Sequence, residues 1–195
     1  MPKVVDHDQR RAEIVQSARQ LIGAHGGEAL TLRRLADECG LANGALRRYF
    51  RFKDDVLLAL DADIVQRFAQ HAEREDYDSQ RGVDAVRTLM NGMLPLDRER
   101  KVTAEVLAAL RDHAAVDESV AEAFSNRIRR LFDQVVAHLK EARDDRQITG
   151  GRDIEVTAAI LVNTVLGINL TATYGEELDV SRYDAAVVEA ILASA

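Results

Sequence analysis

The stretch from Thr31 to Lys53, TLRRLADECGLANGALRRYFRFK, contains two short amphipathic segments separated by a glycine. Thr31 is the expected N-cap of a first helix, because its hydroxyl can accept a hydrogen bond from a free backbone N–H. Gly40 follows where this helix must end, since glycine tolerates the left-handed conformation. Apolar residues recur at helical spacings on one face of the segment: Leu32, Leu35, Ala36 and Cys39.

A second short helix is predicted from Asn43 to Phe50, with Asn43 as its cap. Its packed side consists of Leu46, Tyr49 and Phe50. The remaining residues point outward: Asn43, Gly44, Arg47 and Arg48. Two short helices joined by a tight turn, with a polar and cationic outer face, suit insertion into a DNA major groove.

The same region resembles the DNA-binding domain of TetR/AcrR-type regulators. The resemblance covers about residues 10–60, and its matching positions are Ile14, Ala18, Gly26, Thr31, Leu35, Ala36, Gly40, Leu41, Leu46, Tyr49, Phe50, Lys53 and Leu57. It implies a three-helix DNA-binding domain, which we place at residues 1–52. Three positions depart from the family pattern: Ala42 replaces a common Ser, Ala45 a common Thr, and Arg47 a phosphate-contacting Tyr.

Two kinds of DNA contact follow from this interpretation. Asn43, Gly44, Arg47 and Arg48 are expected to approach base edges, while Thr31, Arg33, Tyr49 and Lys53 are expected to hold the DNA backbone. Lys53 begins the next predicted helix, whose N-terminal N–H groups can assist in phosphate binding. Whether Arg47 contacts guanine or phosphate stays open. For Arg10 and Arg11 a solvated surface and a contact with DNA are equally compatible with the sequence.

The charge of the chain is unevenly distributed. Residues 1–53 hold 10 Lys/Arg and 6 Asp/Glu, a net charge of +4, whereas residues 54–195 hold 16 and 27, a net charge of −11. A basic segment on an otherwise acidic chain favours binding of a polyanion in one orientation. The 2 prolines and 11 glycines among 195 residues indicate an all-α protein.

Residues 53–195 are predicted to form a helical effector-binding and dimerisation domain, which gives about nine helices in the whole chain. Roughly residues 90–180 resemble the BetI-type C-terminal domain of the same family. Candidate residues of an effector pocket are Met90, Met93, Val106, Leu110, Arg111, Phe132 and Asn163. With no Trp and 5% aromatic residues, the sequence disfavours an aromatic cage for a choline-like effector.

Two helices near the C-terminus, about 153–174 and 181–193, are apolar on nearly every face. A helix of this kind must be buried on two sides, which predicts a homodimer through a two-fold four-helix bundle. The expected interface residues are Ile160, Thr164, Gly167, Thr171, Tyr183, Val187 and Ile191. The alternative is that both helices belong to the core of a monomer.

Several function classes lack support in the sequence. The five histidines show no spacing typical of a zinc site, and neither a phosphate-binding loop nor a GxSxG motif is present. We expect no enzymatic activity, no cofactor and no metal. One cysteine, no secretory signal and no apolar run of about 20 residues predict a cytoplasmic protein without a membrane span.

The sequence therefore predicts a ligand-responsive transcriptional regulator, a repressor that releases its double-stranded DNA operator when it binds a small molecule. The alternative is a helical small-molecule or protein-binding module without sequence-specific DNA binding. A third option is a protein that coats DNA without sequence preference.

Overall fold

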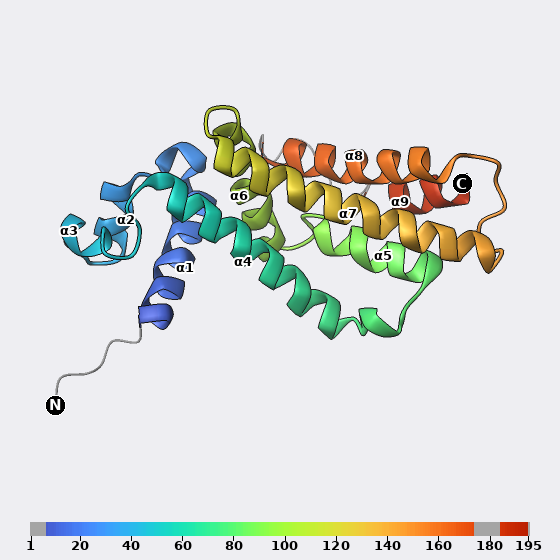
Figure 1. Ribbon diagram of the computed structural model, residues 1–195, viewed down its shortest axis with the longest axis horizontal. Coiled ribbons are helices and arrows are strands. Elements are labelled where there is room, and N and C mark those ends of the chain that lie inside the picture. The colour runs from blue at the N-terminus through green and yellow to red at the C-terminus, as the bar shows by residue number, and fades with distance from the viewer. Residues whose placement is uncertain (1–6, 174–183, 195) are drawn as a thin grey trace. The chain divides into compact units, whose positions relative to one another are not determined.

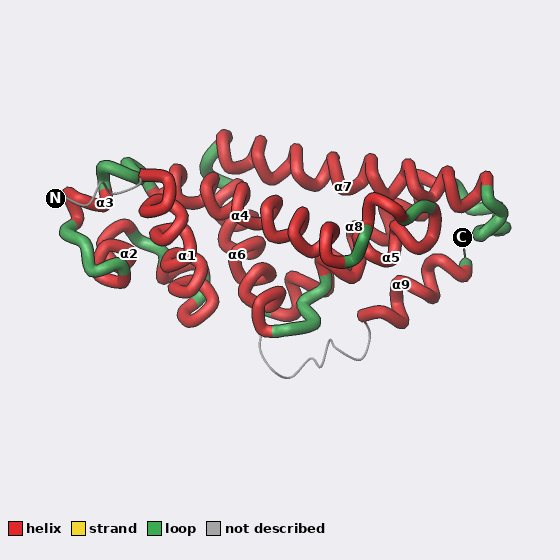
Figure 2. Tube along the Cα trace, turned by 90° about the horizontal axis from the view of Figure 1, so that it is seen from below, coloured by secondary structure: helices red, strands yellow, loops and turns green. Residues whose placement is uncertain are grey.

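The computed structural model describes residues 7–173 and 184–194, which form α-helices and two 3₁₀ turns without any strand (Figure 1). This confirms the prediction of an all-α protein. The helices are α1 (His7–His25), α2 (Leu32–Glu38), α3 (Asn43–Leu46), α4 (Lys53–Arg74), α5 (Gly82–Met93), α6 (Arg98–Ala114), α7 (Glu118–Asp144), α8 (Ile154–Ala172) and α9 (Asp184–Ala193). The 3₁₀ turns are η1 (Gly27–Ala29) and η2 (Tyr77–Ser79). Most helices in the described part of the chain follow each other through short loops (Figure 2).

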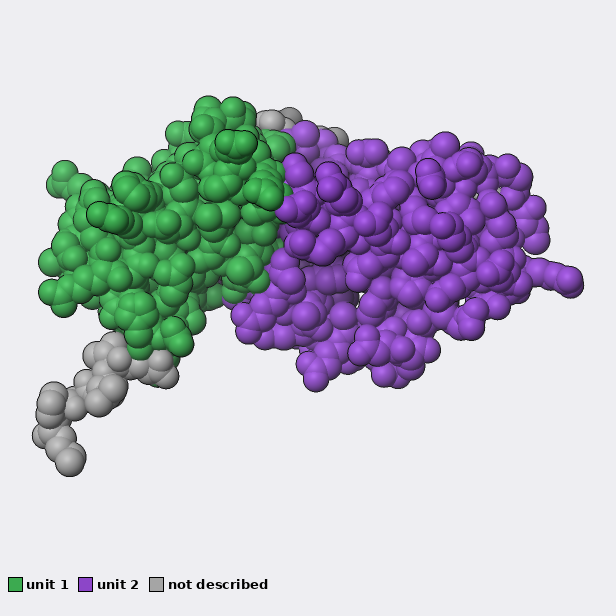
Figure 3. All heavy atoms as spheres, viewed as in Figure 1, with its two compact units in different colours: residues 1–64, 105–124 green, residues 65–104, 125–195 purple. Residues whose placement is uncertain are grey.

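The chain divides into two compact units (Figure 3). The first combines residues 1–64 with residues 105–124, and the second combines residues 65–104 with residues 125–195. Helices α4, α6 and α7 therefore each supply residues to both units. The compact units are divided within helices, so they do not test the domain boundary that we expect between residues 52 and 53. That boundary stays a prediction.

The core of the first unit is built by α1, α2, α3, the first half of α4 and the second half of α6. Its fully buried residues include Ile14, Ile22, Leu35, Leu46, Phe50, Leu57, Leu60 and Leu110. The apolar stripes read from the sequence in the helix-turn-helix segment face this core. Burial of a side chain such as Phe50 contributes about 1.5–3 kcal/mol, so the short helices α2 and α3 depend on tertiary packing.

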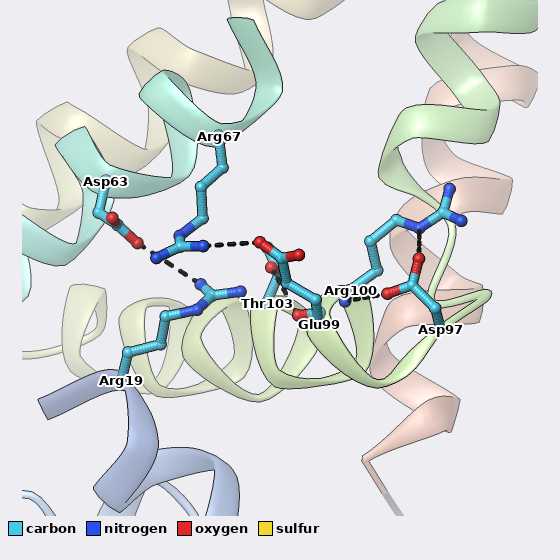
Figure 4. A network of polar contacts seen from close by, with 7 residues as sticks. All are labelled: Arg19, Asp63, Arg67, Asp97, Glu99, Arg100 and Thr103. Carbon is cyan, nitrogen blue, oxygen red and sulfur yellow. Dashed lines mark hydrogen bonds and ion pairs between the residues drawn. The ribbon is translucent and has the colours of Figure 1, made fainter. Parts of the chain in front are cut away.

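A buried ion pair connects α1 to α4 within this unit. The guanidinium of Arg19 lies 3.6 Å from the Asp63 carboxylate, and the Arg19 side chain is only 3% exposed (Figure 4). A charge in such surroundings persists in the folded protein only when an opposite charge compensates it. The pair therefore ties the orientation of α1 to that of α4.

The second unit packs α5, the larger part of α7, α8 and α9 around a separate core. Residues at its centre include Val86, Leu89, Met90, Val135, Leu139, Ala158, Leu161, Val165 and Val188. Polar contacts on its surface join neighbouring elements: Arg67 pairs with Glu99 at 2.6 Å, and Arg87 of α5 pairs with Glu189 of α9 at 2.6 Å (the first pair is drawn in Figure 4).

Helix α8 corrects one expectation from the sequence. Its 19 residues have a mean hydropathy of 1.6, so that by length and composition alone this helix could cross a membrane. The expectation that no apolar run has this length was wrong, because the many Ile, Leu, Val and Ala residues keep the average high despite polar residues such as Asn163 and Asn169. Asn169 is nevertheless buried among protein atoms, where it donates hydrogen bonds to the carbonyls of Val165 and Met93, both at 2.9 Å. A helix in the core of a globular protein can be as apolar as a membrane-spanning helix, so the composition of α8 does not distinguish the two.

Candidate nucleic-acid interface

The turn between α2 and α3 is formed as the sequence predicts. The Thr31 hydroxyl accepts a hydrogen bond from the N–H of Arg34 at 3.2 Å, which caps α2. Gly40 has a φ of +61°, and the N–H of Leu41 reaches back to the carbonyl of Ala36 at 2.8 Å. Glycine is the residue that adopts this conformation without steric cost. The turn therefore sets the direction in which α3 leaves α2.

Helix α3 is shorter than predicted, and its cap differs. It spans Asn43–Leu46, and the residue preceding it is Ala42 in extended conformation, so Asn43 is the first helical residue instead of the cap. Beyond Leu46 the chain tightens, because the N–H groups of Arg48 and Tyr49 bond to carbonyls three residues earlier, at 3.2 and 2.9 Å. The N–H of Phe50 still bonds to the carbonyl of Leu46. Residues 43–50 therefore form a continuous series of helical turns, which we call the α3 coil.

The outer face of this coil is exposed, as the sequence predicts. Asn43, Gly44, Arg47 and Arg48 are all exposed, whereas Leu46 on the opposite side is 0% exposed. A Cβ added to Gly44 would meet no atom within 4 Å. Packing within the chain therefore does not require glycine here, and its absent side chain leaves the backbone open to a ligand.

The other residues predicted to contact DNA differ in their solvent exposure. Thr31 and Arg33 are exposed, while Tyr49 and Lys53 are half-buried. Arg47 bends toward the start of α4, where its Nη1 donates a 3.4 Å hydrogen bond to the carbonyl of Arg51. The structure thus places the predicted residues on α2, α3 and the beginning of α4 within one compact unit.

The N-terminus of α4 is occupied by the chain's own carboxylates. One oxygen of Asp55 accepts hydrogen bonds from the N–H groups of Arg51 and Phe52, both at 2.8 Å. Asp54 contacts His113 of α6 at 2.6 Å. The two amides preceding α4 are therefore already bonded, and any help to Lys53 in holding a phosphate must come from N–H groups within the first turn of the helix.

Arg11 has a role that the sequence did not indicate. Its Nη1 donates a 2.6 Å hydrogen bond to the carbonyl of Tyr49, and its guanidinium lies 4.1 Å from the centre of the Phe50 ring. The ring of His7 lies 4.7 Å from that of Tyr49. The first turns of α1 therefore hold the end of the coil that α3 begins. Arg11 precedes the buried Ile14 by three residues and so lies on the same face of α1. This spacing could have predicted that Arg11 packs against the protein.

Arg10 is also engaged within the chain. Its guanidinium pairs with Glu13 at 2.6 Å and reaches the carbonyl of Cys39 at 3.5 Å. The hydrogen bond that Arg10 donates to the Glu13 carboxylate raises the pKa of Arg10 above its ordinary value, so this side chain stays cationic.

The residues predicted for an effector pocket are divided between the two cores. Val106 and Leu110 are buried in the first core, whereas Met90, Met93 and Phe132 belong to the second. Arg111 pairs with its neighbour Asp112 at 2.8 Å, and Asn163 is exposed and donates to the carbonyl of Ala159 at 2.8 Å. The pocket composition stays a prediction, and only Met90, Met93 and Phe132 of the seven residues belong to the core of the second unit.

Polar groups that the sequence did not single out lie near these three residues in the second unit. Asn169 is 4% exposed and bonds to the carbonyl of Met93. Burial lowers the pKa of His71, whose ring faces Gly92: a Cβ on this glycine would come within 2.7 Å of it. Such groups beside methionines offer hydrogen bonding within an adaptable apolar surface.

The predicted dimer residues follow the outward side of α8. Ile160 and Gly167 are exposed, and Thr164 and Thr171 are half-buried. On α9, Val187 and Ile191 are half-buried, while Tyr183 lies outside the described residues. Val156, one turn before Ile160, adds another large apolar side chain that is 51% exposed. Within the described ranges, the structure contains no group of three or more His, Cys, Asp or Glu residues suited to a metal ion.

A helix-turn-helix segment with an exposed cationic helix, followed by a helical bundle, defines the class of DNA-binding regulators. Residues 14–60 match the family described as bacterial regulatory proteins, tetR family, and residues 82–195 match the C-terminal region of BetI-type transcriptional repressors. The chain belongs to the TetR family of bacterial transcriptional regulators.

Relatives with similar sequences and similar folds support this assignment. The transcriptional regulator PksA of Bacillus subtilis is 30% identical over 160 residues, which cover 80% of this chain and 75% of PksA. A transcriptional regulator of Saccharomonospora viridis, solved with choline, has a TM-score of 0.83 at 15% identity and covers 94% of this chain and 95% of its own. FadR of Bacillus subtilis, solved with stearoyl-CoA, has a TM-score of 0.73 at 16% identity, with coverages of 94% and 98%.

Proposed function

We propose that this regulator is a homodimeric repressor that inserts α3 of each protomer into a major groove of a pseudo-palindromic operator. The observation that carries the proposal is the exposed face of Asn43, Gly44, Arg47 and Arg48 above the buried Leu46. A rigidly held face of this composition matches the donor and acceptor pattern of base edges. Because its target is chromosomal DNA, we place the protein in the cytoplasm.

The residues around α3 divide the work of recognition in this proposal. Arg48 and Asn43 approach base edges, and Gly44 allows the backbone to come close to the DNA. Thr31, Arg33, Tyr49 and Lys53 position the helix on the sugar–phosphate backbone. Arg47 is free to contact either guanine or phosphate, since its 3.4 Å bond to the Arg51 carbonyl is long and easily exchanged.

Dimerisation through α8 and α9 explains why these helices carry apolar residues beyond those needed in their own core. Val156, Ile160 and Gly167 expose a stripe of small and apolar groups on α8. A two-fold axis beside this stripe would bury it against its own copy. The two α3 helices could then contact successive half-sites about one helical turn apart.

Effector binding is proposed for the core of the second unit. Solved structures of similar fold hold choline in one case and stearoyl-CoA in another, so proteins with this fold accommodate chemically different ligands. The scarcity of aromatic residues here continues to favour an effector other than a quaternary ammonium. Because α4, α6 and α7 supply residues to both units, an effector that prefers one arrangement of these helices would shift the population of DNA-binding conformations.

A mobility-shift titration of the purified protein on the DNA upstream of its own gene tests this function. Binding that is tight, salt-dependent and selective against random DNA supports a sequence-specific regulator. Equal affinity for random DNA would indicate a DNA-coating protein. Absence of binding at low salt would favour the alternative, a helical binding module. The expectation of no enzymatic activity stays a prediction, which agrees with relatives that are named as regulators.

A further inference from the structure

Phe52 stands at a position where helix formation does not call for an aromatic side chain. It immediately precedes Lys53, the first residue of α4, and the usual residues before a helix are Ser, Thr, Asp and Asn, whose side chains cap it. Asp55, in the first turn of α4, accepts hydrogen bonds from the N–H groups of Arg51 and Phe52, which precede the helix. A phenyl ring cannot accept a hydrogen bond from the N–H groups of the first turn, so Phe52 does not cap α4 as Ser, Thr, Asp or Asn would.

The Phe52 ring is also solvent-exposed. It is 57% exposed, and in the part of the first unit that the structure describes only Val116 among the large hydrophobic residues is more exposed. The two hydrogen bonds to Asp55, each 2.8 Å long, fix the backbone that carries the ring. Phe50, two residues earlier, is 0% exposed, so the local core is already filled without Phe52. An exposed aromatic on a fixed backbone suggests a contact with another molecule.

The surroundings of the ring identify the kind of partner. The guanidinium of Arg51 lies 5.9 Å from the ring centre, and Arg47 of the α3 coil bonds to the carbonyl of the same Arg51. Lys53 follows directly in sequence. An apolar ring among these cations is complementary to a polyanion that also has apolar surface. Duplex DNA has such surface in the deoxyribose rings and in the C5-methyl group of thymine, which Phe side chains contact.

We propose that Phe52 packs against the apolar surface of the operator, beside the phosphates held by neighbouring cations, and strengthens binding without adding charge. This inference rests on the proposed function. The partial burial of one aromatic ring corresponds to an affinity increase of about three- to tenfold. A contact of this type releases no counterion, so it leaves the salt dependence of binding unchanged.

The test compares Phe52→Ser and Phe52→Leu with the wild-type protein on the operator fragment at several salt concentrations. Phe52→Ser should bind about three- to tenfold more weakly with the same slope of log affinity against log salt, and Phe52→Leu should fall between the two. Serine is a good residue before a helix, so the thermal midpoint of Phe52→Ser should be equal to or above that of the wild type. Val116→Ser, at an 80% exposed valine between α6 and α7, is the matched control and should bind normally.

A second arm separates the two apolar partners on DNA. Operators in which deoxyuridine replaces thymine lack the C5-methyl groups. If the ring contacts a methyl group, the wild-type protein should bind the deoxyuridine operators more weakly than the thymine operators, whereas Phe52→Ser should bind both with the same affinity. If the ring contacts deoxyribose, the replacement should change the affinity of neither protein.

Three results overturn the inference. Unchanged affinity of Phe52→Ser would show that the ring is idle on DNA. A changed salt slope would assign the loss to displaced cations, and a changed sedimentation coefficient would assign the ring to a protein interface. A wild-type protein without selective binding would instead contradict the proposed function itself, and the inference with it.

Discussion

At the scale of individual residues, we propose that side chains within residues 43–50 decide which DNA sequence this regulator recognises. Arg47 and Arg48 are both exposed, yet their local geometry differs, because Arg47 bonds to the carbonyl of Arg51. An arginine that makes two hydrogen bonds to guanine discriminates among bases, whereas one on a phosphate does not. The two roles give different results on cognate and random DNA.

Substituting either arginine by alanine separates these roles. If the residue contacts guanine, Arg47→Ala or Arg48→Ala should weaken operator binding by about 1–3 kcal/mol and relax selectivity at one base position. If it contacts phosphate, affinity for operator and random DNA should fall equally, and the salt slope should decrease by about one. Fluorescence anisotropy titrations with single-base operator variants measure both quantities. Normal operator affinity in both variants would contradict the assignment of α3 as the recognition helix.

Half-buried Arg11 supports the proposed recognition surface from α1. Its hydrogen bond to the Tyr49 carbonyl and its stacking on Phe50 fix the end of the α3 coil. We expect Arg11→Ala to lower the free energy of unfolding by about 1–2 kcal/mol and to reduce operator selectivity with an unchanged salt slope. Arg11→Lys should stay deficient, because lysine lacks the planar group that both contacts use. Full recovery with lysine would indicate a simple phosphate contact instead.

At the scale of elements, the close approach between η1 and α6 fixes how the first unit is packed. A Cβ on Gly27 would lie 2.7 Å from the Cβ of Ala109, a separation that real side chains do not tolerate. Both residues belong to the first unit. Glycine is therefore required here for space, since its φ is not positive.

This contact predicts a compensating pair of substitutions. Gly27→Ala should destabilise the protein by about 1–3 kcal/mol through overpacking. Ala109→Gly alone should cost about 1 kcal/mol, because glycine is a poor helix residue. In the double variant the two costs should be less than additive, since Ala109→Gly removes the Cβ with which the side chain introduced at position 27 would clash. Chemical denaturation of the four proteins gives the coupling energy, and strict additivity would contradict the packing of α6 on η1.

Another element junction, between α5 and α7, contains titratable groups that contact each other. The Glu141 carboxylate lies 2.8 Å from His138 Nδ1 and accepts a 3.0 Å bond from the N–H of Gly82; His138 in turn contacts the Tyr77 hydroxyl at 2.7 Å. The hydrogen bond with His138, followed by that from Gly82, holds the pKa of Glu141 below its ordinary range. Burial raises the pKa of the Tyr77 hydroxyl, which therefore stays protonated at neutral pH.

The sign of the pH effect follows from the lowered pKa. The folded state holds the Glu141 proton less tightly than the unfolded state, so this stabilisation is complete above the ordinary glutamate pKa of about 4.3 and is lost as the pH falls below it. The thermal midpoint of the wild type should decrease more steeply between about pH 5 and pH 3 than that of Glu141→Gln. Glu122→Gln, at an exposed position on the same helix, is the control and should follow the wild-type profile. Parallel curves for wild type and Glu141→Gln would contradict this interpretation.

At the scale of the whole molecule, the central question is how two copies of the chain associate. The exposed stripe of α8, with Val156 and Ile160 at 51% and 37% exposure, is the surface that we propose as the dimer interface. A charge at its centre would be buried without a partner in the dimer, but would be solvated in the monomer.

Ile160→Arg should therefore yield a folded monomer in sedimentation velocity experiments at micromolar concentration. Because the two heads of the proposed dimer bind half-sites as one unit, the operator affinity of this variant should fall by about 100-fold or more while its helical content is retained. Val116→Arg places the same charge on an exposed valine between α6 and α7 and should leave the dimer intact. A wild-type protein that is already monomeric, or a dimeric Ile160→Arg, would contradict the proposed interface.

The sequence by itself determined the features that depend on neighbouring residues. The Thr31 cap, the turn at Gly40 and the outward face of α3 arise from spacings of three and four residues and from local backbone preferences, and the structure confirms each of them. The uneven distribution of charge is likewise a property of the sequence alone.

Only the tertiary structure decided the contacts between residues far apart in the chain. Arg11 on Tyr49 and Phe50, the Arg19–Asp63 ion pair and the division of Val106 and Met90 between two cores join helices whose relative placement no local pattern encodes. The prediction that Asn43 caps α3 was wrong, because Ala42 is the residue that precedes the helix. The free energy gained by burying Leu46 in this helix is larger than that of a side-chain cap. Periodicity shows which face of a helix is buried, but the partner of that face depends on how the whole chain packs.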